Sequence, residues 1–147
     1  MILPDANLLL YAYNSDLSHH ARSAAWWTKA LNGSEPVCLC PLVLFAFVRV
    51  ATSTRVFRHP MTIGEAAARV EEWLQRPNIQ VATVDETDIL VSLRLLKEAG
   101  TGGNLTTDAQ IAALAQRLGA TIHTADGDYA RFPGVRWLNP LAGRRHK

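Results

Sequence analysis

The sequence has few of the features that mark secreted, membrane-bound or zinc-stabilised proteins. It contains only two cysteines, Cys38 and Cys40, which lack the four ligands of a structural zinc site. Its amino terminus has no basic leader, and Pro4, Asp5 and Asn7 interrupt the first apolar run, so we expect neither a signal peptide nor a membrane span. These absences predict a protein of the cytoplasm with two buried, free thiols.

The sequence also lacks a large excess of either positive or negative charge. The 15 basic and 13 acidic residues give a net charge of +2, which permits a polyanionic partner without requiring one. Basic residues cluster at 49–59 and at 142–147. Each cluster is consistent with a solvated surface or with contacts to phosphate groups, and charge alone does not separate the two explanations.

The remaining composition is that of an ordinary globular domain. The 147 residues are 48% hydrophobic and 19% charged, without repeats, linkers or biased tracts. Short β-like runs alternate with longer helical patterns, which predicts an α/β fold with a central parallel sheet flanked by helices. The expected strands are 2–3, 36–40, 79–84, 121–124 and 135–138. We expect one domain over residues 1–141 and a basic tail over 142–147.

Local signals predict where several helices begin and end. Ser18 is expected to cap a helix that Gly33 ends in the left-handed conformation. Residues 62–65 match a capping box. A later helix is expected to begin near Asp108 and to stop at Gly119.

Three acidic segments are the strongest indication of function. Asp5, Asp108 and the pair Asp126 and Asp128 all lie beside apolar sequence, where an unpaired carboxylate is costly. In open α/β sheets, ligands collect at the carboxyl ends of the strands. Asp5 and Asp126 are expected directly after strands and Asp108 at the start of a helix, so the segments can converge on one site.

Carboxylates that converge repel one another unless a cation neutralises them, and oxygen ligands of this kind suit Mg²⁺ or Mn²⁺. Water bound to such an ion has a lowered pKa and can attack a phosphodiester, so the pattern favours phosphodiester hydrolysis. Taken singly, each aspartate also has a structural explanation. Asp108 can cap its helix, Asp5 can form an Asx-turn, and Asp126 and Asp128 can form an ordinary turn.

The acidic segments, in order and spacing, resemble the PIN-domain ribonucleases, and more narrowly the VapC-type toxins of bacterial toxin–antitoxin pairs. The segments that carry the resemblance are Pro4-Asp5-Ala6-Asn7, 103–115 and 124–132, and it extends through 47–52 to 137–141. It implies a PIN-like (Rossmann-like) fold. It also implies a metal-dependent endoribonuclease toxin of a type II toxin–antitoxin system, which uses Mg²⁺ or Mn²⁺ and cuts structured RNA (tRNA or rRNA) to inhibit translation and growth. The implied partners are a second copy of the chain, as a homodimer, and a cognate VapB-like antitoxin whose tail enters the active site.

The resemblance also assigns roles to individual residues. Asp5, Asp108 and Asp126 would bind the metal, and Asp128 would act as an auxiliary acid. Thr124 would orient Asp126 by hydrogen bonding. These residues form the predicted catalytic and metal-binding set.

Arg49 is a candidate RNA-binding residue because it follows the helix expected to border the active site. A solvent-facing or structural arginine is the alternative explanation for this residue. The sequence therefore leaves its role open.

One position departs from the family pattern. The family usually places a glutamate on the helix after the second strand, where this sequence has Ala46, and no acid lies between Pro36 and Met61. Asp128, Glu65 or Glu86 could supply the missing charge. Otherwise metal binding is weakened, and the chain is a catalytically weakened PIN-like module that binds RNA or protein. A phosphatase of small phosphate esters is disfavoured, because the first segment lacks the Asp-x-Asp pair of aspartyl-phosphate enzymes.

Overall fold

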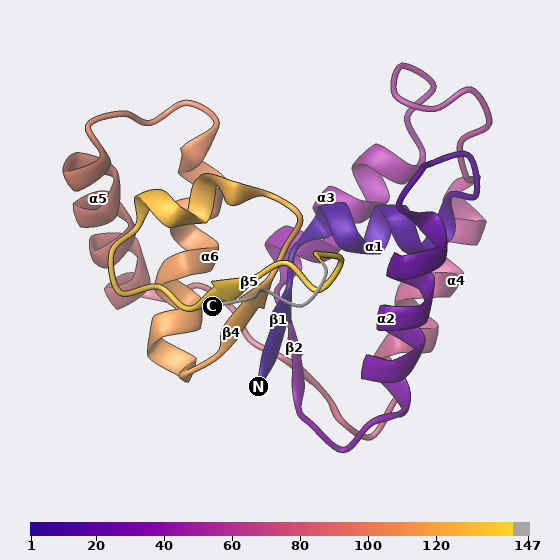
Figure 1. Ribbon diagram of the computed structural model, residues 1–147, viewed down its shortest axis with the longest axis horizontal. Helices are drawn as coiled ribbons and strands as arrows, with labels where there is room; N and C mark the ends of the chain where they lie inside the picture. Colours follow the sequence, from indigo (N-terminus) through magenta and orange to yellow (C-terminus); the bar gives the residue numbers. More distant parts are fainter. Residues whose placement is uncertain (143–147) are drawn as a thin grey trace.

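Five short strands form one sheet at the centre of the computed structural model, which describes residues 1–142 (Figure 1). The strands are β1 (Ile2–Pro4), β2 (Val37–Leu39), β3 (Ile79–Val81), β4 (Thr121–His123) and β5 (Trp137–Leu138). All neighbouring strands are parallel, in the order β3-β2-β1-β4-β5. Apart from Ala142, the predicted basic tail lies outside the described residues.

Helices cover the sheet in two groups. The helices are α1 (Ala6–Tyr13), α2 (His20–Asn32), α3 (Pro41–Ala51), α4 (Ile63–Leu74), α5 (Glu86–Ala99) and α6 (Leu105–Leu118), with a 3-10 turn η1 (Gly127–Arg131). Figure 1 shows α5, α6 and η1 on one side of the strands and α1, α2 and α4 on the other. The predicted fold, a parallel sheet flanked by helices, is confirmed.

The strand order places a topological switch point between β1 and β4. From β1 the chain first adds β2 and β3 on one side, and it later adds β4 and β5 on the other. Ile2 accordingly pairs with Val37 on one side and with Thr121 on the other. Ligands of open α/β sheets bind outside the carboxyl ends of the strands at such a point.

The core explains why the central strands read as apolar runs. Every residue of β1 and β2 is buried, as expected for parallel strands that are covered on both faces. An aromatic cluster beside the sheet packs Trp73 against Trp27, at 5.4 Å between ring centroids, and against Phe47, at 4.9 Å. The Trp73 indole also donates a hydrogen bond of 2.8 Å to the Tyr13 hydroxyl. This cluster fixes α1, α2, α3 and α4 relative to one another.

Three predictions about helix ends are wrong. The helix expected to be capped by Ser18 begins at His20, because residues 15–19 form turns and the His20 amide donates to the Leu17 carbonyl. Gly33 ends that helix at φ −85°, in extended backbone and not in the left-handed region. The later helix begins at Leu105, so Asp108 lies one turn inside it.

Other local predictions are confirmed. Thr62 and Glu65 form a reciprocal capping box, which accounts for Glu65 structurally. Gly119 ends α6 in the left-handed region, at φ 65°. Cys38 and Cys40 are buried and free. Within residues 1–142, every helix is too short or too polar to cross a lipid bilayer.

Candidate active site

Asp5 connects the first strand to the first helix. It follows β1 directly and caps α1, and its Oδ1 accepts a hydrogen bond of 2.8 Å from the Ala6 amide. The residue is only 9% exposed. Burial raises the pKa of the Asp5 carboxyl, as does the charge of Asp126, while hydrogen bonds from Thr124 and Ala6 act in the opposite direction. For the pKa of Asp5, the increase caused by burial is therefore larger than the decrease caused by the hydrogen-bond donors around it.

Thr124 holds the carboxyl end of β4 against that of β1. Its hydroxyl donates to Asp5 Oδ2 at 2.9 Å and accepts from the Asp126 backbone amide at 3.0 Å. The predicted hydrogen bond to Asp126 is thus present, but it reaches the backbone. The carboxylate that Thr124 orients is that of Asp5, because a hydroxyl has one hydrogen to donate and this hydrogen points to Asp5.

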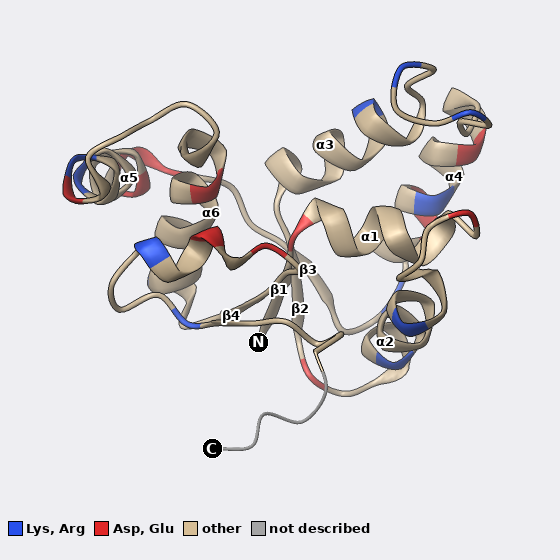
Figure 2. Cartoon of the chain, turned by 45° about the horizontal axis from the view of Figure 1, so that its top comes forward, with Lys and Arg blue, Asp and Glu red and all other residues tan. Residues whose placement is uncertain are grey.

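Asp126 and Asp128 form the turn that follows β4. Asp126 caps η1, and its Oδ1 accepts from the Asp128 amide at 2.9 Å. The same two side chains approach Asp108, so that one oxygen of each of the three residues lies within 4.8 Å of the others. Asp126 and Asp128 therefore both form an ordinary turn and converge with Asp108 on one site. Figure 2 shows acidic segments from the start of α1, from α6 and from the region after β4 facing the middle of the molecule.

Asp108 has the most perturbed carboxyl of the site. No backbone amide of the described residues is capped by its side chain, because the helix begins three residues earlier, at Leu105. Burial, together with the charges of Asp5 and Asp126, raises its pKa to about 7. A structural helix cap does not explain this side chain, whereas a shared cation does.

Tyr129 is a site residue that the sequence analysis did not identify. Its side chain is fully buried, and its hydroxyl donates to Asp108 Oδ1 at 3.2 Å. Burial raises the pKa of Tyr129, as do the charges of Asp5 and Asp108, so the phenol stays neutral and can only donate or accept hydrogen bonds. The adjacent acidic turn was the only signal in the sequence, since an aromatic residue in such a turn ordinarily indicates packing.

Asn7 was part of the first acidic segment but received no role. Its Nδ2 donates to the Thr124 hydroxyl at 3.3 Å, and its Oδ1 accepts from the Ala125 amide at 3.3 Å. The first turn of α1 is thereby tied to the segment after β4. Asn7 therefore helps to hold the two segments that carry Asp5 and Asp126 together.

The position that lacks the family glutamate lies beside this cluster. Ala46 lines a shallow groove of about 660 Å³ together with Phe45, Arg49 and Thr107, the last of which precedes Asp108. A carboxylate at residue 46 would therefore extend into the groove next to the acids. Arg49, in the last turn of α3, lines the same groove, and its contact with an RNA phosphate stays a prediction.

The donor set fits a divalent cation. Its clustered groups are carboxylates, which are the hard oxygen ligands that divalent ions such as Mg²⁺ prefer. Within residues 1–142, none of the ion pairs includes Asp5, Asp108, Asp126 or Asp128. The repulsion that raises the pKa of Asp108 would be relieved by a bound cation.

Comparisons with known proteins agree with this geometry. The model of the PIN domain family matches residues 2–135. Ribonuclease VapC33 of Mycobacterium tuberculosis is 43% identical over 141 residues, covering 96% of this chain and 99% of that protein. Ribonuclease VapC37 of the same species is 42% identical over 144 residues, covering 97% and 99%.

Solved structures share the fold at lower sequence identity. The complex of FitAB with a DNA fragment superposes with a TM-score of 0.73 at 21% identity, over all of both chains. DNA-bound VapBC from Salmonella typhimurium gives 0.67 at 20% identity, over 95% of this chain and 97% of the other. VapC20 of M. tuberculosis, described as a toxin that cleaves the sarcin–ricin loop, gives 0.67 at 18% identity, over 92% and 99%. From the family match and the identity to its full-length relatives, the chain belongs to the PIN-domain family and, within it, to the VapC ribonucleases.

Proposed function

We propose that this chain is a Mg²⁺- or Mn²⁺-dependent endoribonuclease and the toxin of a type II toxin–antitoxin system. The observation that carries the proposal is the convergence of Asp108, Asp126 and Asp128 within 4.8 Å, beside the buried Asp5 at the switch point of the sheet. The full-length relatives VapC33 and VapC37 bear the name ribonuclease. The domain that carries the activity comprises residues 1–141, with 142–147 as a basic tail.

In this proposal Asp5, Asp108 and Asp126 hold the cation, and Asp128 assists them from the exposed side of the turn. A bound divalent cation would lower the pKa of the attacking water and stabilise the negative charge that develops on the phosphodiester. Thr124 and Tyr129 act on the protein side: Thr124 fixes the Asp5 carboxylate, and Tyr129 donates to Asp108. Arg49 contacts a substrate phosphate from the neighbouring groove.

The proposed substrate is structured RNA of the tRNA or rRNA class, cut in the cytoplasm to inhibit translation and growth. VapC20, which shares the fold, is described as cleaving the sarcin–ricin loop. The proposed protein partner is a VapB-like antitoxin, in keeping with the VapBC complex among the structural neighbours. A homodimer would cover apolar side chains of α5 that are about half exposed, Ile89, Leu90 and Leu93.

The test is cleavage of total bacterial RNA by the purified protein in Mn²⁺, in Mg²⁺ and in chelator. Discrete fragments that require metal are expected from the native protein and not from Asp5→Asn. Glu98→Gln is the matched control, because Glu98 is exposed on α5, where it forms a 3.9 Å ion pair with Arg94. Metal-independent cleavage, or equal cleavage by Asp5→Asn, would refute the proposal.

A second function is favoured by one observation, the alanine at position 46 in the groove beside the acids. A PIN-like module with weakened catalysis would still bind RNA or antitoxin. Stable RNA binding by the native protein without cleavage in either metal would identify this function.

A further inference from the structure

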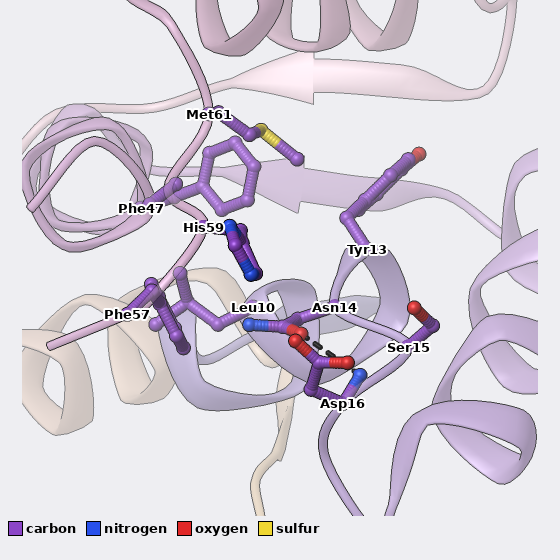
Figure 3. A pocket seen from close by; sticks show the side chains of 10 residues that line it. Leu10, Tyr13, Asn14, Ser15, Asp16, Phe47, Phe57, His59 and Met61 are labelled. Atoms are coloured by element: carbon purple, nitrogen blue, oxygen red, sulfur yellow. Dashed lines mark hydrogen bonds between the residues drawn. The ribbon is translucent and has the colours of Figure 1, made fainter. Parts of the chain in front are cut away.

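A second polar site lies at the opposite end of α1 from Asp5. A cavity of about 300 Å³ opens between the end of α1, α3 and the loop 52–62 (Figure 3). It is at the lower end of the range for small-molecule pockets, so it suits a ligand the size of a nucleobase. None of the residues proposed to bind or position the metal lines this cavity.

The cavity has one aromatic side and one polar side. Figure 3 shows Phe57 and His59 facing Asn14 and Asp16 across the space, with the buried Phe47 ring behind His59. Flat aromatic side chains stack on bases of any sequence, and polar groups at the edge then select among them. The arrangement therefore has the two elements of base recognition.

The polar side has hydrogen-bonding groups that match one particular base. Within the described residues, no hydrogen bond or ion pair reaches the Asp16 carboxylate or the Asn14 amide nitrogen, while Asn14 Oδ1 accepts the Asp16 amide at 3.0 Å. A carboxylate accepts two hydrogen bonds side by side, and among the four RNA bases only guanine offers two adjacent donors on its Watson–Crick edge. The neighbouring guanine O6 would accept from an amide nitrogen such as that of Asn14.

A basic side chain, Arg58, lies beside the cavity at a position from which it would contact the phosphate of a bound nucleotide. A second cavity of about 440 Å³ shares Asn14, Asp16, Phe57 and His59 with the first and is also lined by Arg58. Figure 2 shows basic segments in the loop between α3 and α4, which contains this arginine. A nucleotide with its base in the first cavity would place its phosphate toward Arg58.

The path from the acidic cluster to this cavity fits an RNA strand. The eight residues of α1 span about 12 Å at 1.5 Å per residue, which corresponds to three or four stacked nucleotides at about 3.4 Å each. α3 borders both sites: Ala46 and Arg49 line the groove beside the acids, and Phe47 and Ala51 line the cavity. We propose that this cavity binds an unstacked guanine of the RNA, three or four nucleotides from the cut, with Asp16 as the residue that selects it. The inference rests on the proposed RNA substrate.

The test uses binding alone, in the Asp5→Asn protein, so that it does not depend on catalysis. The probes are GMP, AMP, CMP and UMP and the pentanucleotides UUGUU, UUAUU and UUIUU, where inosine lacks the guanine amino group. Dissociation constants come from NMR titration, which also reports whether Phe57 and His59 are perturbed. GMP and UUGUU are expected to bind best, with UUGUU tighter than GMP, and inosine is expected to weaken binding by roughly tenfold.

Adding Asp16→Asn should raise the dissociation constant of GMP by about 10- to 100-fold and leave that of AMP unchanged or lower, because an amide can pair with adenine. Phe57→Leu should weaken all four nucleotides alike through lost stacking, and Glu98→Gln should change nothing. Equal binding of all bases, or a guanine preference that survives Asp16→Asn, would overturn the proposal. A preference for free GMP without any preference for UUGUU would overturn its RNA source. Absence of any perturbation at Phe57 and His59 would also overturn it and leave a protein partner as the occupant.

A failure of the cleavage test combined with guanine binding would reject only the ribonuclease proposal. Cleavage without guanine binding would reject only this inference. The two proposals are therefore tested separately, one by cleavage with the native protein and the other by binding with the Asp5→Asn protein.

Discussion

Replacing Asp108 by asparagine should stabilise the metal-free protein at neutral pH while it removes metal binding. The pKa of Asp108 rises from an ordinary value of 3.8 to about 7 in the folded protein, because of burial and the charges of Asp5 and Asp126. A folded state with a raised carboxyl pKa binds its proton more tightly than the unfolded chain does. Its contribution to stability is full below about pH 4 and is lost as the pH rises to about 7.

The shift of about three pKa units corresponds to about 4 kcal/mol at about 1.36 kcal/mol per unit. Asp108 is only half-buried, so solvent screening reduces this to about 2 kcal/mol. Asparagine has nearly the shape of the neutral acid, and its oxygen can still accept from Tyr129. At pH 8 in chelator we therefore expect Asp108→Asn to unfold roughly 4–8 °C above the native protein, since about 1 kcal/mol shifts the melting temperature by about 2–4 °C in a domain of this size.

The assay is thermal unfolding of both proteins from pH 4 to pH 8, in chelator and in Mg²⁺. The difference should shrink as the pH falls below about 7 and nearly disappear near pH 4, where the unfolded chain also binds the proton. Mg²⁺ should stabilise only the native protein, in proportion to its binding. Glu98→Gln removes one exposed carboxylate, whose ion pair is to Arg94, and should leave the melting temperature unchanged at every pH. If Asp108→Asn is less stable at pH 8, or if its effect does not depend on pH, Asp108 is a structural residue and the reasoning fails.

Two further predictions concern the surroundings of the acids. Tyr129→Phe removes a hydrogen bond to Asp108 without changing the packed ring. The Mn²⁺ affinity measured by titration should fall by about fivefold, as expected for about 1 kcal/mol, while the melting temperature in chelator stays within a few degrees. An unchanged affinity would show that Tyr129 does not position Asp108. Ala46→Glu places a carboxylate in the groove beside Thr107, so Mn²⁺ affinity and the rate of RNA cleavage should both rise, with Ala46→Gln as the uncharged control; equal effects of both variants would show that the missing charge does not limit the site.

The sequence was sufficient for the fold and for the acidic set because both depend on local patterns. Alternating strand-like and helical segments predicted the parallel sheet, and Asp5 and Asp126 near strand ends predicted convergence. The start of α6 was misplaced because an aspartate before an apolar stripe matches an N-cap, whereas the helix already begins at Leu105. That difference matters for function, since it leaves the Asp108 side chain without a capping role.

The individual hydrogen bonds between distant segments could not be predicted. The Thr124 hydroxyl serves Asp5, which lies 119 residues earlier, and the choice between Asp5 and Asp126 depends on where one hydrogen points. Tyr129 reaches Asp108 across 21 residues, which no periodicity reveals. The cavity at the end of α1 likewise forms only when the loop after α3 packs beside Asn14 and Asp16.

The chain itself contains a structural acid with which the proposed metal site can be compared. Asp88 is 1% exposed, yet Arg117 lies 3.0 Å away, and although burial alone would raise the pKa of Asp88, the hydrogen bond from Arg117 contributes to holding it below its ordinary value. Asp108 has a neutral phenol as its hydrogen-bond donor and three acids near it, and its pKa rises instead. The fold compensates the charge of Asp88 with Arg117 but leaves Asp108 among other acids. The repulsion among these acids destabilises the folded protein unless a cation from solution binds to them. Because the uncompensated acids lie at the switch point of the sheet, where ligands of this architecture bind, this missing positive charge is the strongest physical reason to assign the metal to them.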